Sequence, residues 1–184
     1  MSCPRYRALS SLLALLLLAV VLVACEEDDG DDGGGGPTAP EPFLRLLPDL
    51  GNGPRIELNR DPALDGANLR LEVVAQELQN VRTIDFILTY PGNLMDLTAS
   101  EVGTFLGAGV ISQIVALDAN RVQVFLTGVG AGGQSGDGVV WRADFQGTAP
   151  GTGRIEFENP EAARPDGIVL DDITWLGGGV EVSP

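Results

Sequence analysis

The clearest alternation of hydrophobic and polar positions lies in residues 81–97, VRTIDFILTYPGNLMDL. Every second side chain from 84 to 90 is apolar, namely Ile84, Phe86, Leu88 and Tyr90. Because successive side chains of a β-strand point to opposite faces, this period of two predicts a strand with one buried face and one outward face. Pro91-Gly92-Asn93 then ends the strand, and Leu94 and Leu97 are expected to fold back against the edge of the core.

Other short segments from residue 43 onwards alternate in the same way or form apolar runs between turn residues. The predicted strands cover residues 43–47, 55–58, 68–75, 81–90, 102–106, 110–117, 121–127, 139–145, 154–157, 168–170, 173–176 and 180–182. Bends or loops are expected at residues 62–66, 77–80, 118–120, 128–138 and 159–166. Outside the first 25 residues, no segment keeps the helical period of 3.6. Many short strands at a spacing of roughly 8–12 residues favour an all-β sandwich.

Residues 1–25 have a different pattern, in which two arginines precede one continuous apolar run at residues 12–23. A run of about a dozen residues suits the apolar part of a signal peptide and is short for a transmembrane helix. The run ends in Leu22-Val23-Ala24-Cys25, which resembles a bacterial lipobox. The resemblance implies cleavage before Cys25 and a lipid on this cysteine that anchors the protein to a membrane. An ordinary secretory signal that happens to end near a cysteine is the alternative.

Residues 26–42, EEDDGDDGGGGPTAPEP, combine like charges with glycine and proline. Such a composition cannot form a core and predicts a disordered tether that spans roughly 20–25 Å. A calcium loop is the alternative for the acidic run, but Gly30 and Ala39 stand where oxygen ligands would be needed. The chain therefore divides into a lipoprotein signal helix at 1–25, an acidic tether at 26–42 and one domain at 43–184.

Composition excludes several classes of function. The chain has 11 basic residues, 26 acidic residues and no histidine, and its formal net charge is −15. This negative field repels nucleic acid, so a nucleic-acid partner is not expected. Without histidine, a Ser-His or Cys-His nucleophile cannot form and a zinc site is poorly supported. Both cysteines, Cys3 and Cys25, lie outside the predicted domain, and we expect neither a cofactor nor a metal in it.

Three shorter motifs each have a chemical interpretation and a simpler alternative. The glycines at 128, 130 and 133 match a dinucleotide-binding pattern, but no helix follows them, as that site would require. The carboxylates of Glu156 and Glu158 could act on a glycoside, whereas a solvated strand face is the simpler prediction. Asp171-Asp172 could bind calcium in a loop, whereas a turn is the simpler prediction.

Three stretches between residues 43 and 183 resemble parts of a cohesin domain. Residues 85–94, DFILTYPGNL, are similar to the cohesin strand that ends in Tyr-Asp-Pro, although Pro91 here directly follows Tyr90. Residues 136–145, GDGVVWRADF, resemble the Asp-Gly-Val pattern before a strand that ends in phenylalanine. Residues 179–182, GVEV, resemble the closing strand. The resemblance implies an all-β, cohesin-like jelly-roll β-sandwich of about nine strands.

Cohesins are best known as scaffold modules that bind dockerin domains through one sheet face. The resemblance implies that Asp85 contacts the partner and that Thr83 occupies a nearby contact position. The parity of the strand independently points Asp85 outward beside Ile87. If residues 121–127 and 139–145 share a sheet, as the resemblance implies, four more side chains face the same way. The predicted partner-binding residues are Thr83, Asp85, Ile87, Gln123, Phe125, Arg142 and Asp144.

These features predict a lipid-anchored, non-enzymatic binding module that recruits a dockerin-like protein partner linked to polysaccharide degradation. The expected location is the bacterial cell envelope, with the outer membrane or cell surface favoured over the inner membrane. An aspartate directly after the anchored cysteine is the best-known signal for retention in the inner membrane, and Glu26 stands at that position here. The alternative is a carbohydrate-binding module that binds polysaccharide directly. Trp175 would then stack on a sugar ring, although a place in the core is favoured for this residue.

Overall fold

The computed structural model of this chain describes residues 43–61 and 66–184. The predictions for the signal peptide at 1–25, for Cys25 and for the tether at 26–42 lie outside these residues. The described residues form eleven β-strands. Within this part of the chain, no helix is long and apolar enough to cross a membrane.

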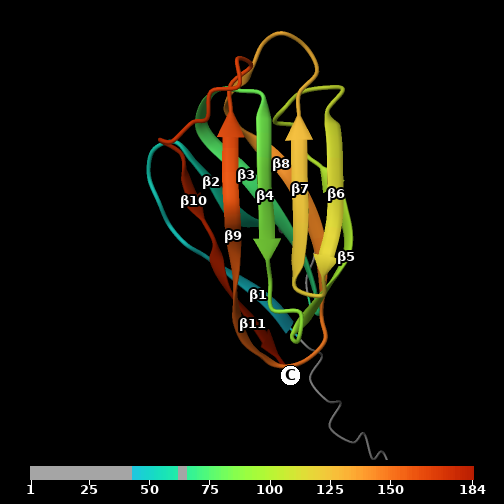
Figure 1. Cartoon of the computed structure of the whole chain (residues 1–184). Helices are drawn as coiled ribbons and strands as arrows, with labels where there is room; N and C mark the ends of the chain where they lie inside the picture. The colour runs from blue at the N-terminus through green and yellow to red at the C-terminus, as the bar shows by residue number, and fades with distance from the viewer. Residues whose placement is uncertain (1–42, 62–65) are drawn as a thin grey trace, which may run out of the picture. The chain divides into compact units, whose positions relative to one another are not determined.

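The strands form two sheets that stack face to face as a sandwich (Figure 1). The six-stranded sheet has the order β1 (Phe43–Pro48), β11 (Gly178–Ser183), β9 (Gly151–Ala163), β4 (Thr83–Thr89), β7 (Arg121–Thr127) and β6 (Ile111–Asp118). The five-stranded sheet has the order β10 (Thr174–Leu176), β2 (Arg55–Asp61), β3 (Asn68–Val81), β8 (Gln134–Gly147) and β5 (Met95–Val102). All neighbours are antiparallel except β10 and β2, which are parallel. The predicted all-β sandwich is confirmed, with eleven strands in place of about nine.

An aromatic cluster sits between the two sheets. Phe86 of β4 is 1% exposed. Its ring centroid lies 6.0 Å from that of Trp141 on β8, 5.3 Å from that of Phe157 on β9 and 6.0 Å from that of Trp175 on β10. The rings meet at tilted or edge-to-face angles, which favour contact between the positive edge of one ring and the negative face of another. Phe86 therefore joins side chains of both sheets in one core.

The chain leaves β4 differently from the prediction. Leu94 is buried at the core and Leu97 packs against it, as expected. Leu97, however, belongs to strand β5, which the sequence did not predict. The predicted strand at 102–106 is wrong, because β5 ends at Val102 and the next residues form turns. Phe105 and Leu106 are nevertheless buried, so the apolar run marks core contacts made from a loop.

Strands β3 and β8 are both longer than predicted. The expected bend at 77–80 lies inside β3, where Glu77 and Asn80 have φ angles of +56° and +54°. The register between β3 and β8 shifts between Val73 and Val74 and on either side of Leu78, so the ladder is irregular at three positions. The backbone N–H of Glu77 donates to Asp137 Oδ1 at 2.6 Å, and that of Asn80 donates to Ser135 Oγ at 2.8 Å. These hydrogen bonds between the two strands allow the glycine-containing first part of β8 to remain paired with β3 across the irregular positions.

The core lies entirely within one compact unit, Thr38–Pro184. Strand β1 at its beginning and strand β11 at its end pair over six residues, from Phe43 opposite Ser183 to Pro48 opposite Gly178. A unit with its own core and with its first and last strands paired is expected to fold independently.

Candidate protein-binding face

Strand β4 separates core residues from surface residues along its whole length. Ile84, Phe86 and Leu88 point inward and are at most 1% exposed. Asp85 and Ile87, between them, are partly exposed on the outer face of the six-stranded sheet. This arrangement confirms the predicted parity and places the carboxylate of Asp85 directly above the core.

Strand β7 adds the next predicted residues to this face. Asp85 lies opposite Phe125, and Ile87 lies opposite Gln123. Directly opposed residues of antiparallel strands have neighbouring side chains on the same face. Thr83 completes the group and shares a hydrogen bond of 3.1 Å with the hydroxyl of Thr127. Five of the seven predicted partner-binding residues therefore lie together: Thr83, Asp85, Ile87, Gln123 and Phe125.

Strand β6 extends the apolar part of the same face. Its register with β7 places Val115 opposite Gln123 and Ile111 opposite Thr127. Ile111 is 61% exposed and Val115 is 40% exposed, which is high for aliphatic side chains. The sequence did not identify them because apolar residues of β6 lie on both of its faces. Here the apolar strip means Ile87, Phe125, Val115 and Ile111.

Strand β9 borders the other side of β4 with carboxylates. In register, Glu161 lies opposite Asp85 and Glu158 lies opposite Ile87. Glu158 lies 3.8 Å from the guanidinium of Arg121, and Glu156 lies 3.0 Å from that of Arg154. Among the described residues, Asp85 and Glu161 have no hydrogen-bond or ion-pair partner for their side chains. Here the acidic row means Asp85, Glu156, Glu158 and Glu161.

A tight turn joins β6 and β7 at the predicted residues 118–120, and the side chain of Asp118 stabilises it. This side chain accepts a hydrogen bond from the backbone N–H of Asn120 at 2.8 Å and another from Arg121 Nε at 2.8 Å. The Asn120 bond, followed by the Arg121 bond, holds the pKa of Asp118 below its ordinary value. The turn thus fixes the relative positions of the two strands that carry most of the apolar strip.

The expectation that residues 139–145 share a sheet with residues 121–127 is wrong. Strand β8, with Arg142 and Asp144, belongs to the five-stranded sheet, so both residues lie on the opposite outer face. Alternation places a side chain inward or outward but does not say which sheet a strand joins. The chain crosses from one sheet to the other between β7 and β8, where the sequence has only four glycines, Val129 and Ala131.

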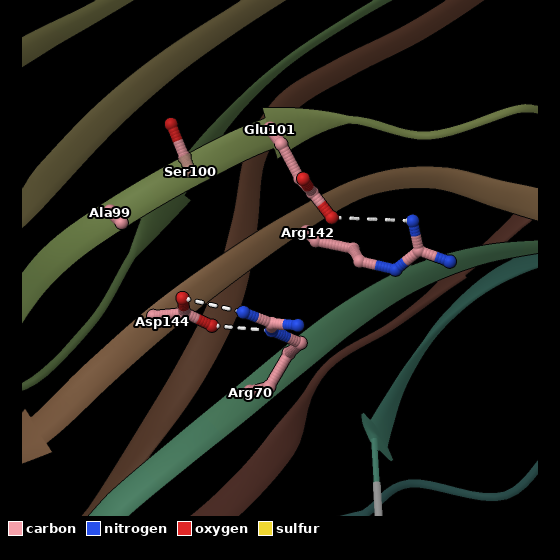
Figure 2. Close-up of a pocket in the computed structure, with 6 residues that line it drawn as sticks. All are labelled: Arg70, Ala99, Ser100, Glu101, Arg142 and Asp144. Carbon is pink, nitrogen blue, oxygen red and sulfur yellow. Dashed lines mark hydrogen bonds and ion pairs between the residues drawn. The ribbon is translucent and has the colours of Figure 1, made fainter. Parts of the chain in front are cut away.

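On that opposite face the two residues are engaged within the domain (Figure 2). Arg70 donates two hydrogen bonds to the carboxylate of Asp144, from Nε at 2.7 Å and from an Nη at 2.9 Å. Arg142 donates to Glu72 at 2.7 Å and to Glu101 at 3.4 Å. The hydrogen bond from Arg70 is the main reason why the pKa of Asp144 lies below its ordinary value. The Arg70–Asp144 and Arg142–Glu101 pairs line a hollow between β3, β8 and β5, in which both guanidinium groups already have carboxylate partners.

Trp175, the candidate for sugar stacking, packs at the edge of the core. Its ring centroid lies 5.2 Å from that of Phe157 and 6.0 Å from that of Phe86. The side chain is only partly exposed, so its ring does not form an open platform. This packing favours the core interpretation of the residue.

The described part of the chain holds no group of three or more acidic residues that is suited to a metal ion. Asp171 and Asp172 lie in an exposed turn, in agreement with the simpler prediction for this pair. Glu156 is exposed and Glu158 is partly exposed on β9. Neither lines the hollow of Figure 2 or a second hollow formed by Leu78, Arg164 and Asp172.

Comparison with solved structures gives a consistent result for the fold. No family model matches the chain, and no curated protein sequence matches it. The non-cellulosomal cohesin of Archaeoglobus fulgidus matches with a TM-score of 0.55 and 18% identity, over 74% of this chain and 88% of that one. The second type II cohesin module of the ScaA adaptor scaffoldin of Acetivibrio cellulolyticus matches with a TM-score of 0.61 and 12% identity, over 71% and 91%.

A third structure is the sixth cohesin of scaffoldin B of Acetivibrio cellulolyticus, solved in complex with a mutant Cel5 dockerin. It matches with a TM-score of 0.56 and 16% identity, over 68% of this chain and 97% of that one. Because the domain covers most of each of these modules, the likeness concerns the whole sandwich rather than one sheet. The predicted fold is thus supported by geometry at a level of identity where sequence comparison finds nothing.

Proposed function

Because the described domain has the fold of cohesin modules, we propose that it is a protein-binding module without catalytic activity. The proposed docking surface is the outer face of β9, β4, β7 and β6, and the proposed partner is a dockerin-like domain. One observation carries the proposal: this sheet face combines the partly exposed apolar strip with the acidic row. The complexes of similar modules with dockerins support the class of partner.

The two parts of the face would contribute differently to binding. Covering the apolar strip removes hydrocarbon from water, which gives about 25 cal/mol for each Å² buried. Phe125 lies at the middle of this strip and is the candidate anchor, because a few central, well-packed side chains dominate most interfaces. Asp85 lies directly opposite Phe125 and would meet a donor of the partner. The remaining carboxylates of the acidic row would speed association with a partner of positive potential.

Affinity capture from the native cell envelope and secreted extract tests this function. The bait is the compact unit Thr38–Pro184, and its variant carries Asp85→Ala and Phe125→Ala. Both substitutions change outward side chains, so the variant is expected to fold while its affinity for the partner falls at least about tenfold. A matched control carries Asp96→Ala and Phe43→Ala, the same residue types at exposed positions of β5 and β1.

A protein retained by the wild type and the control but lost with the Asp85→Ala, Phe125→Ala variant would support the proposed face. Equal retention by all three baits would place the interface elsewhere on the domain. Direct polysaccharide binding would use Trp175, and the packing of this ring against Phe86 and Phe157 argues against it. Capture of polysaccharide alone, unaffected by the substitutions, would reverse that judgement.

The proposal includes a lipid anchor at Cys25, on the outer membrane or cell surface of a bacterial envelope. It rests on the sequence Leu22-Val23-Ala24-Cys25 after an apolar run. We expect the wild-type chain to incorporate a labelled fatty acid and to fractionate with membranes, and Cys25→Ala to do neither. A Cys3→Ala control should behave as the wild type. Label that remained on Cys25→Ala would contradict the anchor.

A further inference from the structure

Strands at the two ends of a sheet have one edge without a strand partner, and proteins usually protect such edges. In the six-stranded sheet, the end strand β1 carries Arg45 and Pro48. In the five-stranded sheet, β10 is only three residues long. The other end strand of that sheet, β5, carries Asp96 and Glu101 and has a register irregularity beyond Leu97. Each of these features discourages pairing with another chain.

Strand β6, the fourth end strand, has a register irregularity only at its end, between Ala116 and Asp118, and none of the other features along residues 111–117. Residues 111–117, ISQIVAL, contain no charged residue, no proline and no glycine. Every residue of this segment except Ile114 is exposed, and among the described residues β6 pairs with β7 alone. Its one charged residue, Asp118, stands at the end and pairs with Arg121 of the turn. An exposed, uncharged edge of this kind is a template for another strand.

We propose that β6 is a homodimerisation edge, at which a second copy of this chain adds its own β6 in antiparallel orientation. The two six-stranded sheets then become one continuous sheet across a twofold axis. The interaction is a β-strand addition, in which backbone hydrogen bonds supply the affinity and outward side chains set the register. It uses the backbone edge of β6 and can form whether or not the outer face binds a partner, although Val115 and Ile111 belong to both surfaces.

Charge is the reason to assign this edge to a second copy. The chain has a formal net charge of −15, so two copies repel each other over most of their surfaces. An antiparallel pair centred on Ile114 places Gln113 opposite the partner's Val115 and Ser112 opposite the partner's Ala116. No carboxylate faces another in this register, because Asp118 lies beyond the paired segment. The edge is therefore complementary to itself in a molecule that is otherwise self-repelling.

The symmetry of this pair also determines how the two docking faces lie. A twofold axis perpendicular to the sheet keeps the outer faces of both copies on the same side. Val115 and Ile111 belong to β6, so the apolar strips of the two copies would meet at the axis. The dimer would present two adjacent docking faces pointing the same way, which increases the avidity for a partner with repeated binding modules.

Sedimentation velocity of the unit Thr38–Pro184, from micromolar to nearly millimolar concentration, tests the dimer. We expect reversible dimerisation of the wild type. An acidic variant (Gln113→Asp, Val115→Asp) and a basic variant (Gln113→Lys, Val115→Lys) each place like charges opposite one another in the proposed register. Each alone should dimerise at least about tenfold more weakly, and an equimolar mixture should recover dimers because opposite charges then face each other.

A control with Ala99→Asp and Ser100→Asp adds the same charges at exposed positions of the other long edge, β5, and should dimerise as the wild type. Circular dichroism and thermal unfolding establish that all variants are folded. A wild type that stays monomeric over the whole range overturns the proposal. So does undiminished dimerisation of both charged variants, or a mixture that stays as monomeric as its components.

Discussion

On the outer face of the five-stranded sheet, Arg70 and Arg142 each meet carboxylates of neighbouring strands. On the outer face of the six-stranded sheet, Asp85 lies opposite Phe125, and within the described residues no cation pairs with it. The two faces belong to one sandwich and share one core. The first satisfies its charges within the domain, whereas the second leaves both a charge and apolar surface for another molecule.

The difference follows from the residues that the register brings together. Across β3 and β8, Arg70 lies opposite Asp144 and Glu72 lies opposite Arg142, so each pair joins opposite charges. A guanidinium that donates two parallel hydrogen bonds to one carboxylate, as that of Arg70 does, is held in a fixed orientation by a strong interaction. The register between β4 and β7 brings no opposite charges together. Exposure alone would not distinguish the faces, but their cross-strand pairs do.

The largest expected effect comes from a substitution in the core between the two sheets. Phe86→Ala removes the ring that contacts Trp141, Phe157 and Trp175, and should lower the free energy of unfolding by about 3–5 kcal/mol. Both faces should be lost in a single transition, which urea unfolding measures. Thr89→Ala, on the outward side of the same strand, is the control and should change stability by less than about 0.5 kcal/mol. A loss below about 1 kcal/mol for Phe86→Ala would contradict a shared core.

The next substitution gives the outer face of the six-stranded sheet an internal ion pair, as the five-stranded face has. We expect a small effect on stability and a large effect on binding. Ile87→Arg places a guanidinium between Glu158 and Gln123. It should weaken binding of the captured partner at least about tenfold, because it pairs the acidic row internally and removes part of the apolar strip. Stability should change by less than about 0.5 kcal/mol. Isothermal titration calorimetry measures the binding, with Ser100→Arg on β5 as the control.

If Ile87→Arg bound the partner as tightly as the wild type, the proposed difference between the two faces would not concern binding. If Ser100→Arg were equally impaired, the loss would reflect the added positive charge and not its position.

The smallest expected effect is a difference between the two faces in how much stability the protein loses at low pH. Because Arg70 lowers the pKa of Asp144, the folded state binds a proton at this carboxylate less readily than the unfolded state. The pair therefore stabilises the fold above the ordinary carboxylate pKa of 3.8, and this contribution is lost as the pH falls through the folded-state value. Arg70 itself stays charged throughout.

Asp144→Asn should accordingly lose less stability between neutral pH and about pH 3 than the wild type does. Urea midpoints at both values measure this difference. Asp85→Asn serves as the comparison, because it removes a carboxylate that has no ion-pair partner among the described residues. Identical acid sensitivity of wild type and Asp144→Asn would show that the Arg70 pair does not contribute.

Much of the six-stranded face could be predicted from local sequence. The alternation of β4 is strict, so Asp85 and Ile87 had to point outward if Phe86 pointed inward. The same holds for β7, where Gln123 and Phe125 alternate with buried valines. Local periodicity succeeds here because each strand lies centrally in its sheet, with one side in the core and one at the surface.

Other parts depended on contacts between distant segments. Arg142 alternates as strictly as Gln123 does, but the sheet that its strand joins is decided by pairing with β3 and β5. Val115 was missed because β6 is an end strand with apolar residues on both sides. The continuation of β8 through its glycines depends on Glu77 and Asn80, whose positive φ angles sequence patterns do not reveal.

Both tryptophans of the chain lie in the aromatic cluster and neither lies on the proposed docking face or the dimer edge. Trp141 is fully buried within the hydrophobic core, so its indole ring is shielded from water. Its fluorescence should therefore be emitted at short wavelength in the folded protein and shift to long wavelength on unfolding. Occupation of the docking face or the edge by a partner without tryptophan should leave this signal almost unchanged. Intrinsic fluorescence thus provides a label-free optical report that separates loss of structure from loss of binding in the surface variants described above, whereas Phe86→Ala changes the surroundings of both tryptophans directly.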